Sequence, residues 1–230
     1  TLAELARRPD LQNKLFEEIQ IVQSKKSKDE QTLNYDDLYN MPLITKVINE
    51  TLRLYPAVSY GTQRQLEKDE YIFVPSNSGE KDKKILIPKG TNCIIHNFSN
   101  HRNKKLWGND ANEWKPERWT GYGDVNSFNF DGPSGADGWE TTYSARNPQS
   151  KRFHPFTRAP RQCFGMNFAQ LEMRVVLPLL ISKFEFTLAE PTHTKVISSG
   201  MISESYEIAG ILKPRDGLWL HCKSRMKPKM

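Results

Sequence analysis

The ten residues FTRAPRQCFG, at positions 156–165, are the most informative segment of this chain. Their cysteine, Cys163, comes directly before an amphipathic stretch that predicts a helix over residues 167–183. The dipole and the unpaired N–H groups at the start of a helix favour a thiolate over a thiol. Arg161, two residues before the cysteine, adds a positive charge. Cys163 is therefore a candidate metal ligand or nucleophile.

The neighbours of Cys163 suit a flat ligand. Gly165 allows such a ligand to approach the backbone closely, and Phe156 and Phe164 are placed to shield the sulfur from water. Two alternatives stand beside this interpretation. A lone cysteine is commonly a small buried apolar residue. A cysteine nucleophile of a hydrolase would need a base, for which His154 is the nearest candidate in sequence.

Two further motifs precede the cysteine. The first is ETLR, at residues 50–53, within a helix predicted over residues 42–55. Glu50 and Arg53 lie three residues apart and off the apolar stripe, so taken alone they form a solvated pair that contributes about 0.2–0.5 kcal/mol. The second motif is PERW, at residues 116–119, in a long stretch with little regular structure.

The three motifs, in this order and at these separations, resemble those of the cytochrome P450 family of haem-thiolate monooxygenases. Residues 50–53 are similar to the Glu-x-x-Arg motif of that family, and residues 116–119 are similar to its Pro-Glu-Arg-aromatic segment. Residues 156–165 resemble its haem-binding loop, in which Phe, Arg, Cys and Gly recur at this spacing. One position departs from the pattern, because Ala159 stands where the family usually has Gly.

The resemblance implies a haem b cofactor (iron protoporphyrin IX) and assigns roles to individual residues. Cys163 would be the axial ligand of the iron and would push electron density onto it. Arg161 would bind a haem propionate, and Arg64 is a second candidate for that role. The expected cofactor-binding set is Cys163, Phe156, Arg161, Gly165 and Arg64.

The resemblance also implies roles away from the cysteine. Glu50, Arg53 and Arg118 would form a buried network that fixes the segment leading into the cysteine loop. Residues 58–62, together with Gly210 and Ile211, would line the substrate pocket, although ordinary packing is the alternative for each of them.

The fold class implied is mainly α with small β-sheets, an α+β arrangement that forms the C-terminal half of the P450 fold. Residues 1–230 would be the C-terminal part of a single P450 domain, beginning near the end of its central helix, with the N-terminal half absent. The oxygen-activating acid–alcohol pair of the family belongs to that absent half. No catalytic residue is therefore expected in this segment, and the isolated segment is expected to be inactive.

The activity implied for the whole protein is insertion of one oxygen atom from O2 into a small, apolar organic molecule. A separate reductase would supply the electrons, because no Gly-x-Gly-x-x-Gly fingerprint for a flavin or nicotinamide follows a predicted strand. Two alternatives on the same scaffold are a haem-thiolate isomerase or dehydratase and a non-catalytic truncated gene product. Relatives of this kind are expected at the cytosolic face of the endoplasmic reticulum membrane, held only by an anchor in the missing N-terminal part.

The composition excludes several other classes of protein. The net charge of the 230 residues is +6 and is scattered, without the basic and aromatic interleaving that nucleic-acid binding requires. The alternative to solvated lysines is a basic face that docks an acidic electron donor. Three widely separated cysteines do not form a disulfide framework, and no Cys-x-x-Cys spacing predicts a zinc site.

Local patterns predict most of the remaining elements. A helix opens at Pro9 and a shorter one near Asn34, and several segments read as strands. These are residues 71–74 and 84–87 as a hairpin, residues 93–96, residues 184–188, and residues 206–212 with 218–222 as a closing hairpin.

Overall fold

The computed structural model describes residues 1–26, 33–74, 83–119, 130–131, 142–143, 153–157, 162–190, 206–209, 211–214 and 217–225. Its helices are α1 (Leu2–Ala6), α2 (Pro9–Ser24), α3 (Tyr35–Tyr39), α4 (Pro42–Leu54), α5 (Asn97–Asn100), α6 (Lys104–Trp107), the 3₁₀ helix η1 (Pro116–Arg118) and α7 (Met166–Lys183). Its strands are β1 (Tyr60–Gln65), β2 (Glu70–Val74), β3 (Lys83–Ile87), β4 (Asn92–His96), β5 (Phe130–Asp131), β6 (Thr142–Tyr143), β7 (Phe184–Leu188), β8 (Tyr206–Ala209), β9 (Ile211–Pro214) and β10 (Leu220–Ser224).

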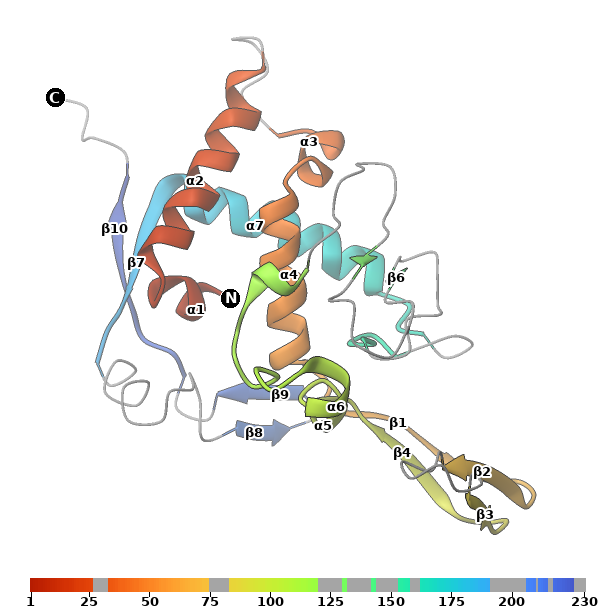
Figure 1. Ribbon diagram of the computed structural model, residues 1–230. Helices are drawn as coiled ribbons and strands as arrows, with labels where there is room; N and C mark the ends of the chain where they lie inside the picture. The colour runs from red at the N-terminus through yellow and green to blue at the C-terminus, as the bar shows by residue number, and fades with distance from the viewer. Residues whose placement is uncertain are drawn as a thin grey trace, which may run out of the picture.

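The main hydrophobic core lies where α2, α4 and α7 pack together (Figure 1). Each helix carries apolar residues at spacings of three and four, which places them on one face and drives burial of that face. The fully buried aliphatic side chains of this core include Leu15, Ile19, Ile44, Ile48 and Ile181.

A side chain of α2 caps the first turn of helix α4. Pro42 occupies the first turn, and Met41 at the N-cap has no side-chain capping bond. The carboxylate of Glu18 replaces that cap, since its two oxygens accept the N–H groups of Leu43 (2.9 Å) and Ile44 (3.1 Å). Two of the unpaired donors at the start of α4 are thereby satisfied from a neighbouring helix. This arrangement fixes the helix that carries the ETLR motif.

A second, aromatic cluster links the PERW motif to the cysteine loop. Its buried members are Trp107, Ala111, Trp119, Phe153 and Met166. Phe153 lies ten residues before the cysteine and Met166 three after it, while Trp107 ends α6 and Trp119 directly follows η1. The two flanks of the cysteine loop therefore pack on the segment that carries the arginine of the PERW motif.

The helix predicted over residues 167–183 is confirmed as α7, and the face that it buries partly matches its apolar residues. Its apolar spacing predicts a stripe of Phe168, Leu171, Val175 and Leu179. Leu171 and Val175 are partly buried against the core, whereas Phe168 and Leu179 are exposed. The buried residues of α7 also include Gln170, Leu177 and Ile181. Apolar spacing located the helix, while the packing partners determined which side of it is covered.

The strands form two-stranded antiparallel sheets in the described residues. The predicted hairpin is confirmed, because β2 pairs with β3 in a register that sets Ile72 opposite Ile85. The pairs β1–β4 and β2–β3 extend away from the helices (Figure 1).

The predicted closing hairpin of residues 206–212 with 218–222 is wrong. β8 instead pairs with β9, so that Ala209 lies opposite Ile211. β10 pairs with β7, which comes more than 30 residues earlier in the chain and directly follows α7. Proximity in sequence suggested the wrong partner for β10.

Within the described ranges, no helix combines the length and the apolar character needed to cross a membrane.

Candidate functional site

The cysteine loop ends at the start of α7. Gly165 is the N-cap of this 18-residue helix, and Cys163 lies two residues before the cap. The N–H of Cys163 donates to the carbonyl of Phe156 at 2.9 Å, and the carbonyl of Cys163 accepts the N–H of Met166 at 3.3 Å. The first hydrogen bond joins the phenylalanine and the cysteine of the motif, so the loop is closed by its own backbone.

The side chain of Cys163 is exposed. The alternative of a small buried apolar residue is therefore wrong for this cysteine. The expected shielding of the sulfur by Phe164 is also wrong, because the ring of Phe164 is fully exposed. Phe156 is partly buried and packs against the aromatic cluster. The backbone orients Cys163, but the described side chains leave its sulfur open.

The space beside Gly165 is also open. A Cβ placed on this glycine would meet no atom within 4 Å. The thiol of Cys163 and the rings of Phe164 and Phe168 are likewise exposed, so the described residues at the start of α7 include several uncovered apolar side chains.

Two of the predicted propionate donors are less well defined. Arg161 and Ala159 lie outside the described residues. Arg64 is on β1, opposite Cys93 of β4, and its side chain is exposed. The structure therefore neither joins Arg64 to the cysteine loop nor gives it a carboxylate partner within the described parts of the chain.

The Glu50 carboxylate is the centre of a buried hydrogen-bond network. Glu50 and Arg53 are both fully buried. Arg53 donates to both carboxylate oxygens, from Nε at 2.9 Å and from Nη2 at 2.8 Å. Arg118 donates from Nε at 2.8 Å, and the indole of Trp119 donates at 3.0 Å. The backbone N–H of Lys115 adds a further bond at 2.8 Å.

Both arginines also hold carbonyl groups of the chain between α5 and η1. Arg53 Nη1 donates to the carbonyls of His101 and Ala111, each at 2.6 Å, and Arg53 Nη2 donates to that of Glu113 at 2.9 Å. Arg118 Nη2 donates to the carbonyl of Asp110 at 3.0 Å. The network therefore ties this irregular segment to α4, where a regular ladder of backbone bonds is missing.

The solvated pair expected for Glu50 and Arg53 taken alone is wrong. Their local spacing placed them off the apolar stripe of α4, but a segment 48 to 69 residues later in the sequence covers them. Loss of one member of such a pair would leave an uncompensated buried charge, at a cost of about 3–5 kcal/mol.

Asp110 lies at the accessible edge of the network. Its partial burial alone would raise its pKa, but hydrogen bonds from Lys115 and Arg118 outweigh that effect. The pKa of Asp110 consequently lies below its ordinary value. The carboxylate remains charged and pairs with Lys115 at 3.2 Å and with Arg118 at 3.3 Å.

His101 is a site residue that the sequence did not reveal. It is fully buried, and its imidazole Nε2 accepts the backbone N–H of His154 at 3.1 Å. His154 is itself buried and contacts Asn100. The sequence contains five histidines, and no local motif marks His101 among them. Its partner, His154, is 53 residues away, so sequence spacing does not predict their contact.

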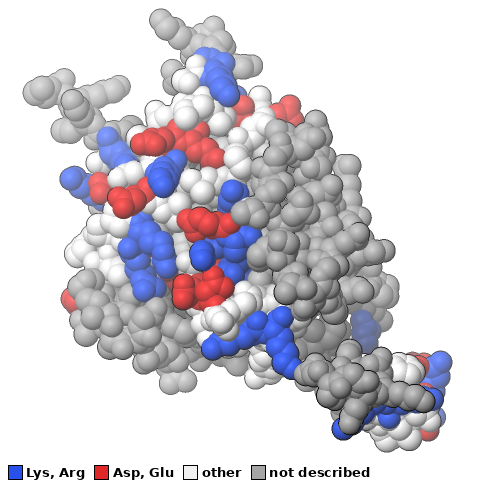
Figure 2. All heavy atoms as spheres, in the orientation of Figure 1, with Lys and Arg blue, Asp and Glu red and all other residues white. Residues whose placement is uncertain are grey.

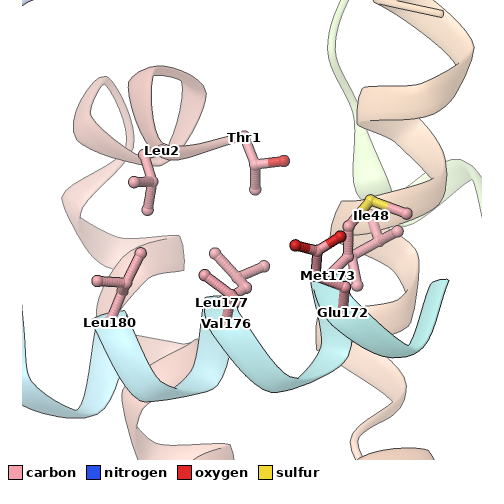
Figure 3. A pocket seen from close by; sticks show the side chains of 8 residues that line it. All are labelled: Thr1, Leu2, Ile48, Glu172, Met173, Val176, Leu177 and Leu180. Atoms are coloured by element: carbon pink, nitrogen blue, oxygen red, sulfur yellow. The ribbon is translucent and has the colours of Figure 1, made fainter. Parts of the chain in front are cut away.

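A separate open groove of about 260 Å³ runs along α7 (Figure 3). Residues of α7 form one wall, and Leu2 of α1 and Ile48 of α4 lie across from them. The groove is mostly aliphatic and includes neither Cys163 nor any other residue predicted to bind the cofactor.

The predicted pocket-lining residues lie on other elements. Residues 58–62 lead into and begin β1, with Val58 and Tyr60 exposed and Ser59 buried. Ile211 is the first residue of β9, and Gly210 lies outside the described residues. Figure 2 shows basic and acidic side chains interspersed on the face in view, so the described residues there form no single basic patch.

Comparison with known proteins gives a consistent result. The family model of cytochrome P450 matches residues 1–210. Cytochrome P450 monooxygenase 91 of Postia placenta is 34% identical over 195 residues, which cover 82% of this chain and 32% of that protein. A cytokinin hydroxylase of Arabidopsis thaliana is 30% identical over 218 residues, or 94% of this chain and 35% of that protein.

Cytochrome P450 3A12 of Canis lupus familiaris is 32% identical over 216 residues, or 93% of this chain and 36% of that protein. The chain thus spans about a third of the length of the curated relatives it matches. The family match overturns the hydrolase alternative, in which His154 would have served Cys163 as a base. The resemblance that the three motifs suggested is confirmed, and the chain belongs to the cytochrome P450 family, which implies a haem cofactor.

Proposed function

We propose that the protein containing these 230 residues is a haem-thiolate monooxygenase, which inserts one oxygen atom from O2 into an apolar organic substrate. Membership of the cytochrome P450 family supports this reaction class. The observation that carries the proposal is the position of Cys163. It is an exposed thiol two residues before the N-cap of an 18-residue helix, in a loop closed by its own N–H.

The residues around Cys163 fit a haem. A single soft sulfur donor suits iron. The free space at Gly165 leaves room for a flat macrocycle, and the exposed rings of Phe164 and Phe168 offer it an apolar surface. Burial of these rings under a porphyrin would remove them from water, at roughly 25 cal/mol per Å² of apolar surface. The thiol of Cys163 is exposed because, on this proposal, the haem would cover it.

When bound, the haem supplies an iron centre that activates O2 with electron density donated by the thiolate. The chain itself positions the backbone of Cys163 at the start of a helix. The start of α7 favours negative charge at this position. The two backbone hydrogen bonds of Cys163, to Phe156 and to Met166, fix its main chain.

Arginines would hold the propionate groups of the haem. We assign this role to Arg161, which is two residues from Cys163, and with less support to Arg64, whose exposed guanidinium is on β1. A guanidinium is suited to a carboxylate because its N–H groups form a planar fork.

The network of Glu50, Arg53 and Arg118 would maintain the proximal side of the site. It holds the segment between α5 and η1, and the aromatic cluster transmits that support to both flanks of the cysteine loop. We assign the network a structural role, because none of its members contacts Cys163 within the described residues.

O2 and a separate electron-donating reductase would serve the reaction, and residues 1–230 would form one part of a P450 domain. The protein would act at the cytosolic face of the endoplasmic reticulum membrane, for which the family resemblance is the only support. The cofactor would be haem b.

Cysteine variants of the haem-loaded protein test the proposal. Cys163→Ser removes the proposed ligand, and Cys93→Ser and Cys222→Ser are matched controls because all three thiols are free and exposed. We expect the strongly red-shifted ferrous–CO absorption band of a thiolate haem, together with substrate oxidation, in the wild-type protein and both controls. Cys163→Ser should lose both. Persistence of the band in Cys163→Ser would contradict the proposal.

A requirement for O2 and an electron donor distinguishes this function from its alternatives. A haem-thiolate isomerase or dehydratase would convert a peroxide without either, and a non-catalytic gene product would convert nothing. We expect substrate oxidation to consume O2 and reducing equivalents. Turnover of a peroxide in the absence of a reductant would favour the isomerase instead.

A further inference from the structure

We propose that His101 is a positioning residue for Cys163, connecting the Glu50–Arg53 network to the turn that leads into the cysteine loop. The inference rests on the proposed haem-thiolate function. Both the main chain and the side chain of His101 accept a hydrogen bond. Its carbonyl accepts Arg53 Nη1 at 2.6 Å, and its imidazole Nε2 accepts the backbone N–H of His154 at 3.1 Å. His101 therefore joins the network to this turn through one hydrogen bond to each.

The hydrogen bond to His154 acts where the turn begins. The carbonyl of His154 accepts the N–H of Thr157 at 3.0 Å, which closes a four-residue turn over residues 154–157. Phe156 lies inside this turn, and its carbonyl accepts the N–H of Cys163. His101 therefore fixes the first residue of the turn, and the turn fixes the carbonyl that orients the cysteine.

The turn stores backbone strain that needs such support. Thr157 has a φ of 61°, in the left-handed region that a β-branched residue rarely adopts. A residue in this conformation persists only where its surroundings hold it there. The contact from His101 to His154, three residues earlier, is one of the bonds that hold the turn.

The imidazole of His101 has to be neutral for this role. An Nε2 atom that accepts a hydrogen bond carries no proton, so the proton of neutral His101 is on Nδ1. Burial lowers the pKa of His101 well below its ordinary value, and the nearby charges of His154, Arg53 and Arg102 lower it further. The environment thus keeps the acceptor lone pair available near neutral pH.

Aromatic side chains hold the ring of His101 in this orientation. Its centroid lies 5.4 Å from that of Phe153 and 6.4 Å from that of Trp107. Both partners belong to the aromatic cluster that flanks the cysteine loop. Close packing on these neighbours restricts the motion of the ring.

Three variants of the haem-loaded protein test this role. His101→Gln can place an amide oxygen near the position of Nε2 and keep an acceptor, whereas His101→Leu has a side chain of similar bulk without one. His96→Leu is the control, because His96 also accepts a backbone N–H with a ring nitrogen, from Ser99 at 3.1 Å, but is outside the turn. The readouts are the thiolate-type fraction of the ferrous–CO spectrum and the hydrogen exchange rate of the His154 amide.

We expect His101→Leu to speed exchange of the His154 amide by about tenfold or more, because a buried donor loses its acceptor. The thiolate-type fraction should fall in the same variant. His101→Gln should restore most of both readouts, and His96→Leu should change neither. A purely packing role for His101 would make the glutamine and leucine variants equivalent, and that result would overturn the proposal.

If His101→Leu does not fold, His101→Asn is compared with His101→Gln. His101→Asn is polar but too short to reach the His154 amide, so it should behave worse than His101→Gln. Equal exchange rates and equal spectra in these two variants would overturn the proposal. A wild-type protein without the thiolate-type band would instead reject the proposed function, and amide exchange would still measure the contribution of His101.

Discussion

Glu50 shows how a single charge can organise distant parts of this chain. Its carboxylate accepts hydrogen bonds from Arg53, Lys115, Arg118 and Trp119. A buried carboxylate is tolerated only when its lone pairs are matched in this way. The local sequence around Glu50 suggested a solvent-exposed pair with Arg53. Helix periodicity does not show that a segment 65 residues later in the chain covers this pair.

Arg53→Ala is expected to prevent retention of haem. The substitution leaves Glu50 short of two donors and frees the carbonyls of His101, Ala111 and Glu113. We predict a loss of about 3–5 kcal/mol in the free energy of unfolding, measured by denaturant titration alongside haem content.

The matched control for this variant is Arg7→Ala, which also removes an arginine from an i,i+3 pair, here with Glu4. Arg7 is partly exposed, so we expect a change of no more than about 1 kcal/mol. Normal haem content in Arg53→Ala would contradict the structural role of the network.

His101 is expected to make the protein sensitive to mild acid. Its pKa in the folded state lies well below the ordinary value of 6.5, while in the unfolded state it returns to that value. Below pH 6.5 the unfolded chain therefore binds a proton that the folded protein does not. The free energy of unfolding should fall as the pH decreases, by at most about 1.4 kcal/mol per pH unit from this group.

The pH effect can be isolated by comparing two proteins. The wild-type protein and His101→Gln share all other titrating groups, so the difference between their unfolding free energies should grow as the pH falls from 6.5 to 4.5, in favour of the variant. Denaturant titrations at several pH values measure it. Parallel pH profiles for the two proteins would mean that His101 is not buried as a neutral ring.

At the scale of elements, helix α4 depends on α2 for its first turn. The Glu18 carboxylate caps Leu43 and Ile44, and burial raises the pKa of this carboxyl even though the two capping bonds and Lys46 lower it. We predict that Glu18→Ala destabilises the protein by about 1–3 kcal/mol, since two donors lose their partner. Glu18→Gln should cost less, because it retains one acceptor oxygen.

Amide hydrogen exchange provides the readout for this cap. Exchange at Leu43 and Ile44 should accelerate more than exchange in the middle of α4. The matched control is Glu17→Ala on the same helix, because Glu17 is exposed. An equal effect of the two substitutions would show that Glu18 does not act as the cap.

The elements that the sequence predicted correctly are those with local signals. Proline at the first turn marked α2 and α4, and strand patterns on both sides of a turn marked the β2–β3 hairpin. The pairing of β10 was mispredicted because its partner, β7, lies beyond a long intervening segment. Similarly, the three motifs located the site, while the contact between His101 and His154 depends on packing that no local pattern encodes.

At the scale of the whole molecule, the isolated chain leaves much apolar surface uncovered. Besides Phe164 and Phe168, exposed side chains include Val176 and Leu179 on α7, and an aliphatic groove lies between α1, α4 and α7 (Figure 3). Exposed apolar surface that no ligand or partner covers is an aggregation liability. We therefore expect the isolated 230 residues to aggregate and to show no turnover.

Reconstitution of the purified 230-residue chain with haem tests this expectation. Size-exclusion chromatography should give no stable monomeric haem complex, and the ferrous–CO spectrum should lack the red-shifted thiolate band. A monomeric, haem-loaded chain with that band would show that the residues described here suffice for the site.

In the proposed enzyme, the sulfur of Cys163 binds the haem iron. X-ray absorption at the iron K-edge of the haem-loaded protein measures this directly, because it detects a sulfur atom in the coordination sphere. We predict a sulfur ligand in the wild-type protein and in Cys93→Ser, and its loss in Cys163→Ser. An unchanged iron–sulfur signal in Cys163→Ser, or the absence of sulfur from the wild-type iron, would contradict the account.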